Sequence, residues 1–283
     1  MFRRYDLHTH STASDGTLSP LQLVERARAV GLEGLALTDH DTTDGLDEAS
    51  AAAREAGMEW IPGIELSVTW SQGTVHVVGL GLGEDRVDLE AGLGEIRRFR
   101  DWRAEEIGRR LSREGISGAF EGARALSQGR LIGRSHFARY LVARGLARDE
   151  RHVFQAYLTR GKPGYVPGQW ASLADAVGWI HAAGGQAVLA HPARYDLTLG
   201  RLKQLIGEFR ELGGEALEVV SGSHSPQDRD RVALLAREFR LMASVGSDFH
   251  GPQIPWLALG HLPPLPKGCE PLWQTWVKTG ESI

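Results

Sequence analysis

The chain has 283 residues, a formal net charge of −4 and 42% hydrophobic residues, which suits one large soluble domain, or one domain with an insertion. This charge leaves no basic footprint for tight binding of a nucleic-acid duplex, although it permits a local basic pocket for one phosphate or a short strand. The single cysteine, Cys269, excludes an intrachain disulfide and a metal site built on sulfur.

The N-terminus shows no targeting segment. Met1-Phe2-Arg3-Arg4 runs directly into a predicted strand, without the apolar stretch of a signal peptide. No later apolar run is long enough to cross a membrane. We therefore expect a cytoplasmic protein, and nothing in the sequence indicates an obligate protein partner.

The first 87 residues alternate predicted strands and helices. One helix begins after Ser19, which is a plausible N-cap, with Pro20 at the first helical position and Gly31 to end it. An alanine-rich helix is predicted at residues 44–57. Strands are predicted at residues 5–7, 34–38, 60–64 and 75–78.

The pattern becomes helical from residue 88 to about residue 160. Four apolar residues have the spacing of one helix face: Ile96, Phe99, Ile107 and Leu111. The Gly- and Pro-containing segment 161–167 predicts a return loop. We therefore expect a helical insertion at residues 88–167 within a domain formed by residues 1–87 and 168–283.

Alternation resumes after the predicted insertion. Helices are predicted to start near Ser172, Leu199 and Ser225, and the Pro- and Trp-containing tail after Gly251 is predicted to be a loop that covers a face. Strands are predicted at residues 187–190, 216–220 and 243–247. Strands separated by helices indicate a parallel sheet with right-handed crossovers. Seven strands favour an α/β fold of the distorted (β/α) barrel type over an open doubly wound sheet.

Histidines and carboxylates follow several of these strands. His8 and His10 are two residues apart, so both can point to one face and reach one ion. Asp248 and His250 repeat this spacing after the last strand. Glu65 ends a buried-looking run, where a carboxylate is costly unless it is paired or bound to a cation. This set predicts a metal centre.

Four further candidate ligands have a structural alternative when each is taken alone. Asp15 has the setting of a turn aspartate, and His76 and His191 have that of hydrogen-bonded core histidines. His40 has Asp39 beside it, which we interpret as a support or a helix cap. Oxygen and nitrogen donors favour Mn, Zn, Fe or Mg, and nine candidates exceed the needs of one ion. Two or three divalent ions are therefore expected.

Three basic residues are candidates for binding a phosphate: Arg134, His136 and Lys162. A guanidinium fits phosphate geometry, but arginine is abundant in the predicted insertion, so a solvated surface role is the alternative for each. Other phosphate and hydrolase motifs are absent. The sequence has no Gly-x-x-x-x-Gly-Lys-Ser/Thr loop, and the segment 222–225 lacks the elbow of a serine hydrolase.

In chain order, these motifs resemble the PHP (polymerase and histidinol phosphatase) family. The segments that carry the resemblance are residues 6–16, 37–41, 63–65, 76–79, 190–192 and 246–250. The resemblance implies a distorted seven-stranded β/α barrel with a trinuclear metal centre that hydrolyses phosphoesters. The insertion and the segment 161–166 are similar to the subgroup of the 3′,5′-nucleotide bisphosphate phosphatase and the 5′-to-3′ exoribonuclease RNase AM.

The resemblance also implies roles for single residues. The implied metal ligands are His8, His10, Asp15, His40, Glu65, His76, His191, Asp248 and His250. Among them, Asp248, Glu65 and His191 are expected to take part in catalysis, and Arg134, His136 and Lys162 to contact the substrate phosphate. Ser221 stands where an asparagine is expected, which is a departure from the family pattern.

We expect a metal-dependent phosphoesterase in which a metal-bridging hydroxide attacks phosphorus in line, with manganese the leading candidate metal. The expected substrate is a nucleoside 3′,5′-bisphosphate or the 5′ end of a short single-stranded oligonucleotide, and Tyr165 or Trp256 is a candidate for stacking on a base. A histidinol-phosphate-type or general small-molecule phosphatase is the alternative. The full ligand set disfavours a non-catalytic binding module. Metal-bound water and His224 are both candidates for the leaving-group proton donor.

Overall fold

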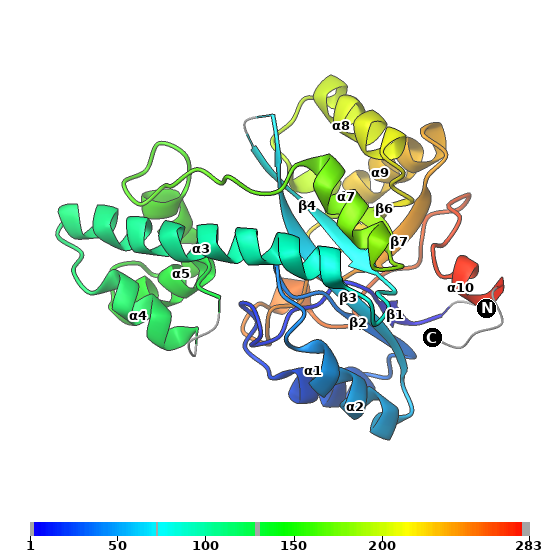
Figure 1. Ribbon diagram of the computed structural model, residues 1–283, viewed down its shortest axis with the longest axis horizontal. Helices are drawn as coiled ribbons and strands as arrows, with labels where there is room; N and C mark the ends of the chain where they lie inside the picture. Colours follow the sequence, from blue (N-terminus) through cyan, green and yellow to red (C-terminus); the bar gives the residue numbers. More distant parts are fainter. Residues whose placement is uncertain (1–2, 72, 128–130, 279–283) are drawn as a thin grey trace.

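A computed structural model describes residues 3–71, 73–127 and 131–278, and its centre is a seven-stranded sheet (Figure 1). The strands lie side by side in chain order: β1 (Tyr5–Asp6), β2 (Gly34–Leu37), β3 (Glu59–Trp70), β4 (Gly73–Leu80), β5 (Gln186–Leu189), β6 (Ala216–Ser221) and β7 (Met242–Gly246). The two edges meet, since Leu7 N donates to Val245 O at 3.0 Å and Asp248 N donates to His8 O at 2.9 Å. The sheet is therefore nearly closed into a barrel, which confirms the predicted fold class.

Strand β4 is antiparallel to both of its neighbours, so the expectation of a parallel sheet is wrong at this strand. The reason is that β3 continues through Trp70 and turns back into β4 as a hairpin, without a helix between the two strands. The strand predicted at residues 60–64 therefore extends further, and residues 65–67 lie inside β3. Glu65 and His76 therefore project from within paired strands, not from strand ends.

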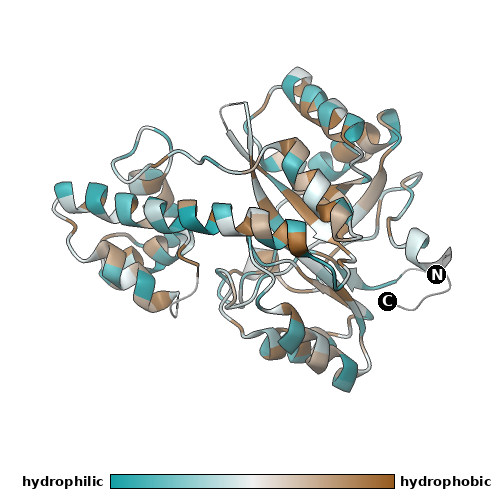
Figure 2. Cartoon of the chain, viewed as in Figure 1, coloured by the Kyte–Doolittle hydropathy of each residue, from teal (hydrophilic) through white to brown (hydrophobic). Residues whose placement is uncertain are grey.

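Five helices cover the outside of the barrel: α1 (Pro20–Ala29), α2 (Leu46–Ala56), α7 (Leu173–Ala182), α8 (Leu199–Glu211) and α9 (Pro226–Glu238). Ser19, Ser172 and Ser225 each accept a hydrogen bond at the N-terminus of a helix, as the sequence predicts for the first and the last. Apolar residues face the sheet and polar residues face outward (Figure 2). The barrel core thus follows from amphipathic helices packed on apolar strands.

The chain between β4 and α7 forms four helices: α3 (Val87–Arg113), α4 (Ala119–Leu126), α5 (Arg134–Ala143) and α6 (Glu150–Val153), the last continued by a π-helical turn (Phe154–Leu158). The first half of α3 packs on the barrel at Gly92, where a side chain would collide with the ring of Trp179. The second half contributes Ile107 and Leu111 to a separate hydrophobic cluster, which also contains Phe137. Helix α3 therefore connects the barrel to a second small core (Figure 1).

The tail after Gly251 contains more structure than the expected loop. It holds a 3-10 turn at Pro255–Leu257 and the short helix α10 (Gln274–Lys278). Trp273 packs edge-on against Tyr5, with ring centres 5.4 Å apart, so the tail covers the end of the barrel where β1 begins. Within the described ranges, no helix combines the length and the apolar character needed to cross a lipid bilayer.

Candidate metal centre

The nine predicted ligands come from six strands or the loops that follow them, and they meet at one end of the barrel. His8, His10 and Asp15 follow β1, His40 follows β2, Glu65 lies in β3, His76 lies in β4, His191 follows β5, and Asp248 and His250 follow β7. Seven of them line a cavity of about 270 Å³, and His8 and His10 lie buried beneath it. The fold therefore brings together every residue that the sequence predicted as a ligand.

Glu65 lies at the centre of this group and is fully buried. Its Oε1 is 2.9 Å from Nδ1 of His76 and 3.1 Å from Nε2 of His191. Its Oε2 is 2.9 Å from Nδ1 of His40 and 3.3 Å from Nε2 of His8. A carboxylate with imidazole nitrogens around both of its oxygens can bridge two cations.

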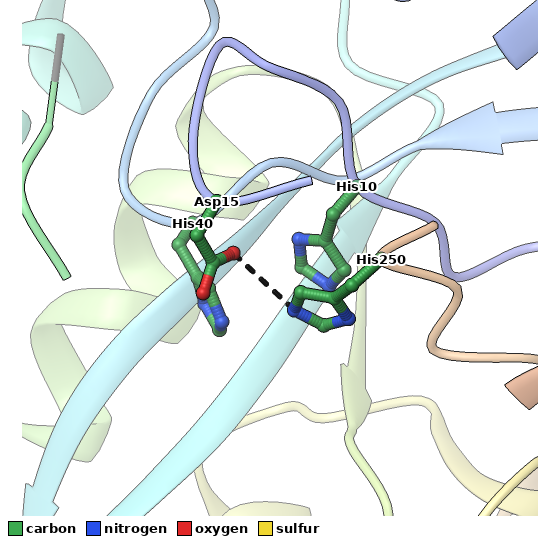
Figure 3. A group of neighbouring side chains, drawn as sticks. All are labelled: His10, Asp15, His40 and His250. Atoms are coloured by element: carbon green, nitrogen blue, oxygen red, sulfur yellow. Dashed lines mark ion pairs between the residues drawn. The ribbon is translucent and has the colours of Figure 1, made fainter. Parts of the chain in front are cut away.

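The ligand atoms form three overlapping groups, each with all atoms within 4.8 Å of one another: His10, Asp15, His40 and His250; His8, His10, Glu65 and Asp248; His40, Glu65 and His76. Figure 3 shows the first group, in which four side chains from three different loops point toward a common centre. Oδ1 of Asp15 lies 3.2 Å from Nε2 of His250. Shared members place the three groups next to one another, as a multinuclear site requires.

Several of these polar atoms are buried without a hydrogen-bond partner among the described residues. They are Nε2 of His8, both ring nitrogens of His10, Oδ1 of Asp15, Nδ1 of His40, Oε2 of Glu65, Nδ1 of His76 and Nδ1 of His191. An unpartnered buried polar atom costs about 1–3 kcal/mol. Most of these residues belong to the three groups of neighbouring nitrogen and oxygen donors, so bound divalent cations would satisfy one atom of each, and the residues fit such ions.

The electrostatics divide the imidazoles of the cluster. Nearby carboxylates outweigh burial and raise the pKa values of His8, His40 and His250, whereas two other imidazoles have lowered pKa values. Burial, together with the charge on His250, lowers the pKa of His10 to about 3, and burial lowers that of His76 to about 4. These imidazoles are thus neutral at pH 7, the form that binds metal. Burial alone would raise the pKa of Glu65, but the positive charge of His40, whose own pKa is raised, holds it well below its usual value, so the carboxylate is ionised.

The loop that carries Asp15 is held in place by Asp39. The Asp39 carboxylate accepts hydrogen bonds from Ser11 N at 2.7 Å, from Ser11 Oγ at 2.6 Å and from Ser14 Oγ at 2.5 Å. Asp39 belongs to none of the three ligand groups. Its position fits the supporting role that the sequence indicated.

Two residues to which sequence reasoning gave no role contact the ligands directly. Arg194, in the 3-10 turn Pro192–Arg194, donates from Nη1 to Oδ2 of Asp248 at 2.5 Å. Glu218, in β6, contacts both His8 and His191. The available signal for Glu218 was a single carboxylate within the otherwise apolar strand 216–220.

Helices α3 and α5 contribute arginines to the lining of the cavity. Arg100 and Arg103 project from α3 and Arg134 from the start of α5, and all three line the cavity. Arg100 pairs with Asp41, through Nε at 2.7 Å from Oδ2. Sequence reasoning missed Arg100 and Arg103 because charged residues are common throughout this helix and most of them are solvated.

Arg103 and Arg134 form no ion pair with any carboxylate in the part of the chain that the structure describes. Arg103 donates from Nε and Nη2 to Val166 O at 3.0 Å, and Arg134 lies over the Phe154 ring at 5.6 Å. Burial and the charge of Arg134 lower the pKa of Arg103 to about 9, and burial also lowers the pKa of Arg134. A buried guanidinium and a half-buried one without a carboxylate counter-ion are costly, and an anion in the cavity would compensate them.

Of the other predicted substrate contacts, His136 and Lys162 lie away from this cavity. His136 is buried, accepts a hydrogen bond from Gly133 N at Nδ1 (3.0 Å), and lines a neighbouring cavity of about 180 Å³. Lys162 is exposed on the return loop and is not among the described residues that line either cavity. A contact of either side chain with the substrate stays a prediction.

The remaining predicted contacts are also outside the cavity lining. Tyr165 and Trp256 do not line it, and Trp256 is 72% exposed, whereas the described aromatic residues Phe154 and Trp170 do. His224 donates from Nδ1 to Val219 O at 3.2 Å and is likewise not part of the described lining. Phe154 and Trp170 are therefore better placed than the predicted pair for contact with a base.

Comparison with known proteins decides the family, because the PHP domain family matches residues 6–166. The chain belongs to the PHP domain family. It is 50% identical over 270 residues to a 3′,5′-nucleoside bisphosphate phosphatase of Chromobacterium violaceum, covering 95% of each chain. It is 45% identical over 274 residues to the 5′-3′ exoribonuclease Rnm of Escherichia coli, covering 96% of this chain and 93% of the relative.

The fold is shared with a solved structure of an amidohydrolase from Chromobacterium violaceum with bound sulfate and no metal. The TM-score is 0.94 at 48% identity, covering 97% of this chain and 96% of that chain. The family resemblance read from the sequence motifs is thus confirmed.

Proposed function

We propose that the protein is a metal-dependent phosphoesterase acting on nucleotides. It removes the 3′-phosphate from nucleoside 3′,5′-bisphosphates, releases nucleotides from the 5′ end of short oligonucleotides, or does both. The relatives named as a bisphosphate phosphatase and as a 5′-3′ exoribonuclease support this substrate class. The observation that carries the proposal is one cavity lined both by candidate metal ligands and by Arg103 and Arg134, which have no carboxylate partner among the described residues.

The three ligand groups would hold two or three divalent ions, with manganese as the first candidate. Such ions polarise phosphoryl oxygens and lower the pKa of a bound water, which provides a nucleophile at neutral pH. Glu65, Asp248 and His191 are the proposed catalytic ligands, because each lines the cavity beside the place where the phosphoryl group must lie. Arg194 holds the Asp248 carboxylate in one orientation through its 2.5 Å contact.

Arg103 and Arg134 would bind a second phosphate of the same substrate. A nucleoside 3′,5′-bisphosphate and a 5′-phosphorylated oligonucleotide both carry an additional phosphate one ribose away from the bond that is cleaved. A guanidinium binds phosphate with two parallel hydrogen bonds. The substrate anion would thereby compensate the two cations that have no carboxylate partner among the described residues.

Residues 88–167 are proposed to act as an insertion that covers the cavity, with residues 1–87 and 168–283 forming the barrel. Arg100, Arg103, Arg134 and Phe154 all come from this segment and reach the cavity wall. Phe154 would contact the base, since aromatic faces stack on any base with little sequence preference. A base contact of this kind suits an enzyme that accepts nucleotides of different sequence.

A panel of three substrates tests the proposal. Phosphate release with Mn²⁺ is measured from adenosine 3′,5′-bisphosphate, from a 5′-phosphorylated trinucleotide and from histidinol phosphate, with Asp248→Ala as the inactive control. Release of mononucleotides from the trinucleotide is followed in parallel. We expect turnover of at least one nucleotide substrate, abolished in the variant. Turnover of histidinol phosphate alone would replace the proposal with a small-molecule phosphatase.

A further inference from the structure

Glu218 connects two of the metal ligands from behind. It lies in the middle of β6 and is 2% exposed. Its Oε1 lies 3.0 Å from Nδ1 of His8, and its Oε2 accepts a hydrogen bond from the backbone N–H of His191 at 2.5 Å. One carboxylate therefore contacts a ligand that follows β1 and a ligand that follows β5.

The contact with His8 determines which ring nitrogen is free to bind a cation. An ionised carboxylate only accepts hydrogen bonds, so Nδ1 of His8 must carry the proton. When a cation is bound, Nε2 is the nitrogen that presents its lone pair to the cluster, where it lies 3.3 Å from Oε2 of Glu65 and 3.6 Å from Oδ1 of Asp248. Glu218 thus specifies the tautomer of His8 that can act as a ligand.

The contact with His191 holds an unfavourable backbone conformation. His191 has φ 29° and ψ 54°, in the left-handed region that non-glycine residues rarely adopt, at a cost of about 1–3 kcal/mol. This conformation directs the His191 ring toward Glu65, with Nε2 3.1 Å from Oε1. The hydrogen bond from His191 N to Glu218 helps to retain it.

Glu215, which lies just before β6, makes the same types of contact with residues that are not candidate metal ligands. Glu215 accepts a hydrogen bond from Ala187 N at 2.7 Å and pairs with Nε2 of His181 at 3.0 Å. The two glutamates therefore make matching pairs of contacts, one backbone N–H and one imidazole each. Replacing either glutamate therefore removes the same kinds of contact, at a half-buried position for Glu215 and at a buried position for Glu218.

We propose that Glu218 is a positioning residue of the metal centre, which fixes the His8 tautomer and the His191 backbone so that both imidazoles reach the cluster around Glu65. The inference rests on the proposed function only in that it requires divalent ions to bind there. No ligand role is assigned to Glu218 itself, because it belongs to none of the three groups and its two oxygens contact His8 Nδ1 and His191 N.

The test compares Glu218→Gln with the matched variant Glu215→Gln by equilibrium Mn²⁺ binding to metal-stripped protein. Glutamine has one carbonyl oxygen for two donors, so either His8 changes its tautomer or His191 N loses its acceptor. We expect a loss of about 10–100-fold in affinity for at least one ion in Glu218→Gln and wild-type affinity in Glu215→Gln. Equal affinity in the wild type and Glu218→Gln would overturn the inference while leaving the proposed function intact. A wild-type protein that binds no Mn²⁺ would overturn both.

A second measurement does not depend on the folding of the variant. In Zn²⁺-loaded wild-type protein, ¹⁵N chemical shifts of the ring report which nitrogen of His8 carries the proton. The expected result is a protonated Nδ1 and a metal-bound Nε2. A metal-bound Nδ1 would contradict the assignment.

Discussion

Arg134→Met is expected to separate recognition of the second phosphate from the chemistry at the metals. Arg134 lines the cavity, is half-buried and has no carboxylate partner in the described part of the chain. A hydrogen bond to a charged group contributes about 1.5–3 kcal/mol. If a bidentate contact with phosphate is lost, its two bonds give a lower bound of about 3 kcal/mol, or roughly a 150-fold decrease in kcat/KM.

The assay compares adenosine 3′,5′-bisphosphate with 3′-AMP, which lacks the second phosphate. The decrease in kcat/KM should appear with the bisphosphate and be small with 3′-AMP. 3′-AMP has no second phosphate for Arg134 to bind, so the substitution removes no contact with it. Arg144→Met, at an exposed position after the same helix, is the matched control and should behave as the wild type. The free energy of unfolding should not fall in Arg134→Met, because a half-buried cation without a carboxylate partner is removed. An equal loss with both substrates would refute the second-phosphate site.

Three further predictions concern stability. Arg100→Met should lower the free energy of unfolding by about 3–5 kcal/mol in urea denaturation, because it leaves Asp41 buried and unpaired; a change below about 1 kcal/mol would contradict this. Burial lowers the pKa of His136 to about 4. Between about pH 6.5 and pH 4, His136 is therefore protonated in the unfolded chain and neutral in the folded protein. The stability of the wild type relative to His136→Gln should therefore fall between pH 6.5 and pH 4, by up to about 3 kcal/mol, and a constant difference would refute the assignment. Chelation should lower the melting temperature of the wild type more than that of Asp248→Ala, since ions that bind only the folded state stabilise it; equal shifts would contradict ion binding at Asp248.

The fold was predictable where local pattern and tertiary structure agree. Ser19-Pro20 and Ser225-Pro226 mark helix starts through capping geometry that depends only on neighbouring residues. The hairpin of β3 and β4 was not predictable in the same way. Polar Glu65 and Ser67 suggest a connection, but both are buried, Glu65 among imidazoles and Ser67 beside Asp41. Partners distant in sequence thus turn an apparent loop into a strand.

The candidate site also contains residues that local spacing predicts and residues whose role depends on tertiary contacts. Ligands such as His8 and His10 were recognisable because their spacing in a strand places both on one face. The role of Glu218 depends on a contact with His8 across 210 residues of sequence, which no local pattern encodes. Arg103 likewise differs from its solvated neighbours only because the fold turns it into the cavity.

The most direct test of the account is the rate of nucleotide phosphoester hydrolysis as a function of bound metal. Metal-stripped protein is titrated with Mn²⁺, and bound ions and phosphate release from adenosine 3′,5′-bisphosphate are measured in the same samples, with release of mononucleotides from a 5′-phosphorylated trinucleotide followed in parallel. The account predicts no turnover without metal and a rate that rises as the ligand groups fill. Full activity in the stripped protein, or filled sites without hydrolysis of either substrate, would contradict it.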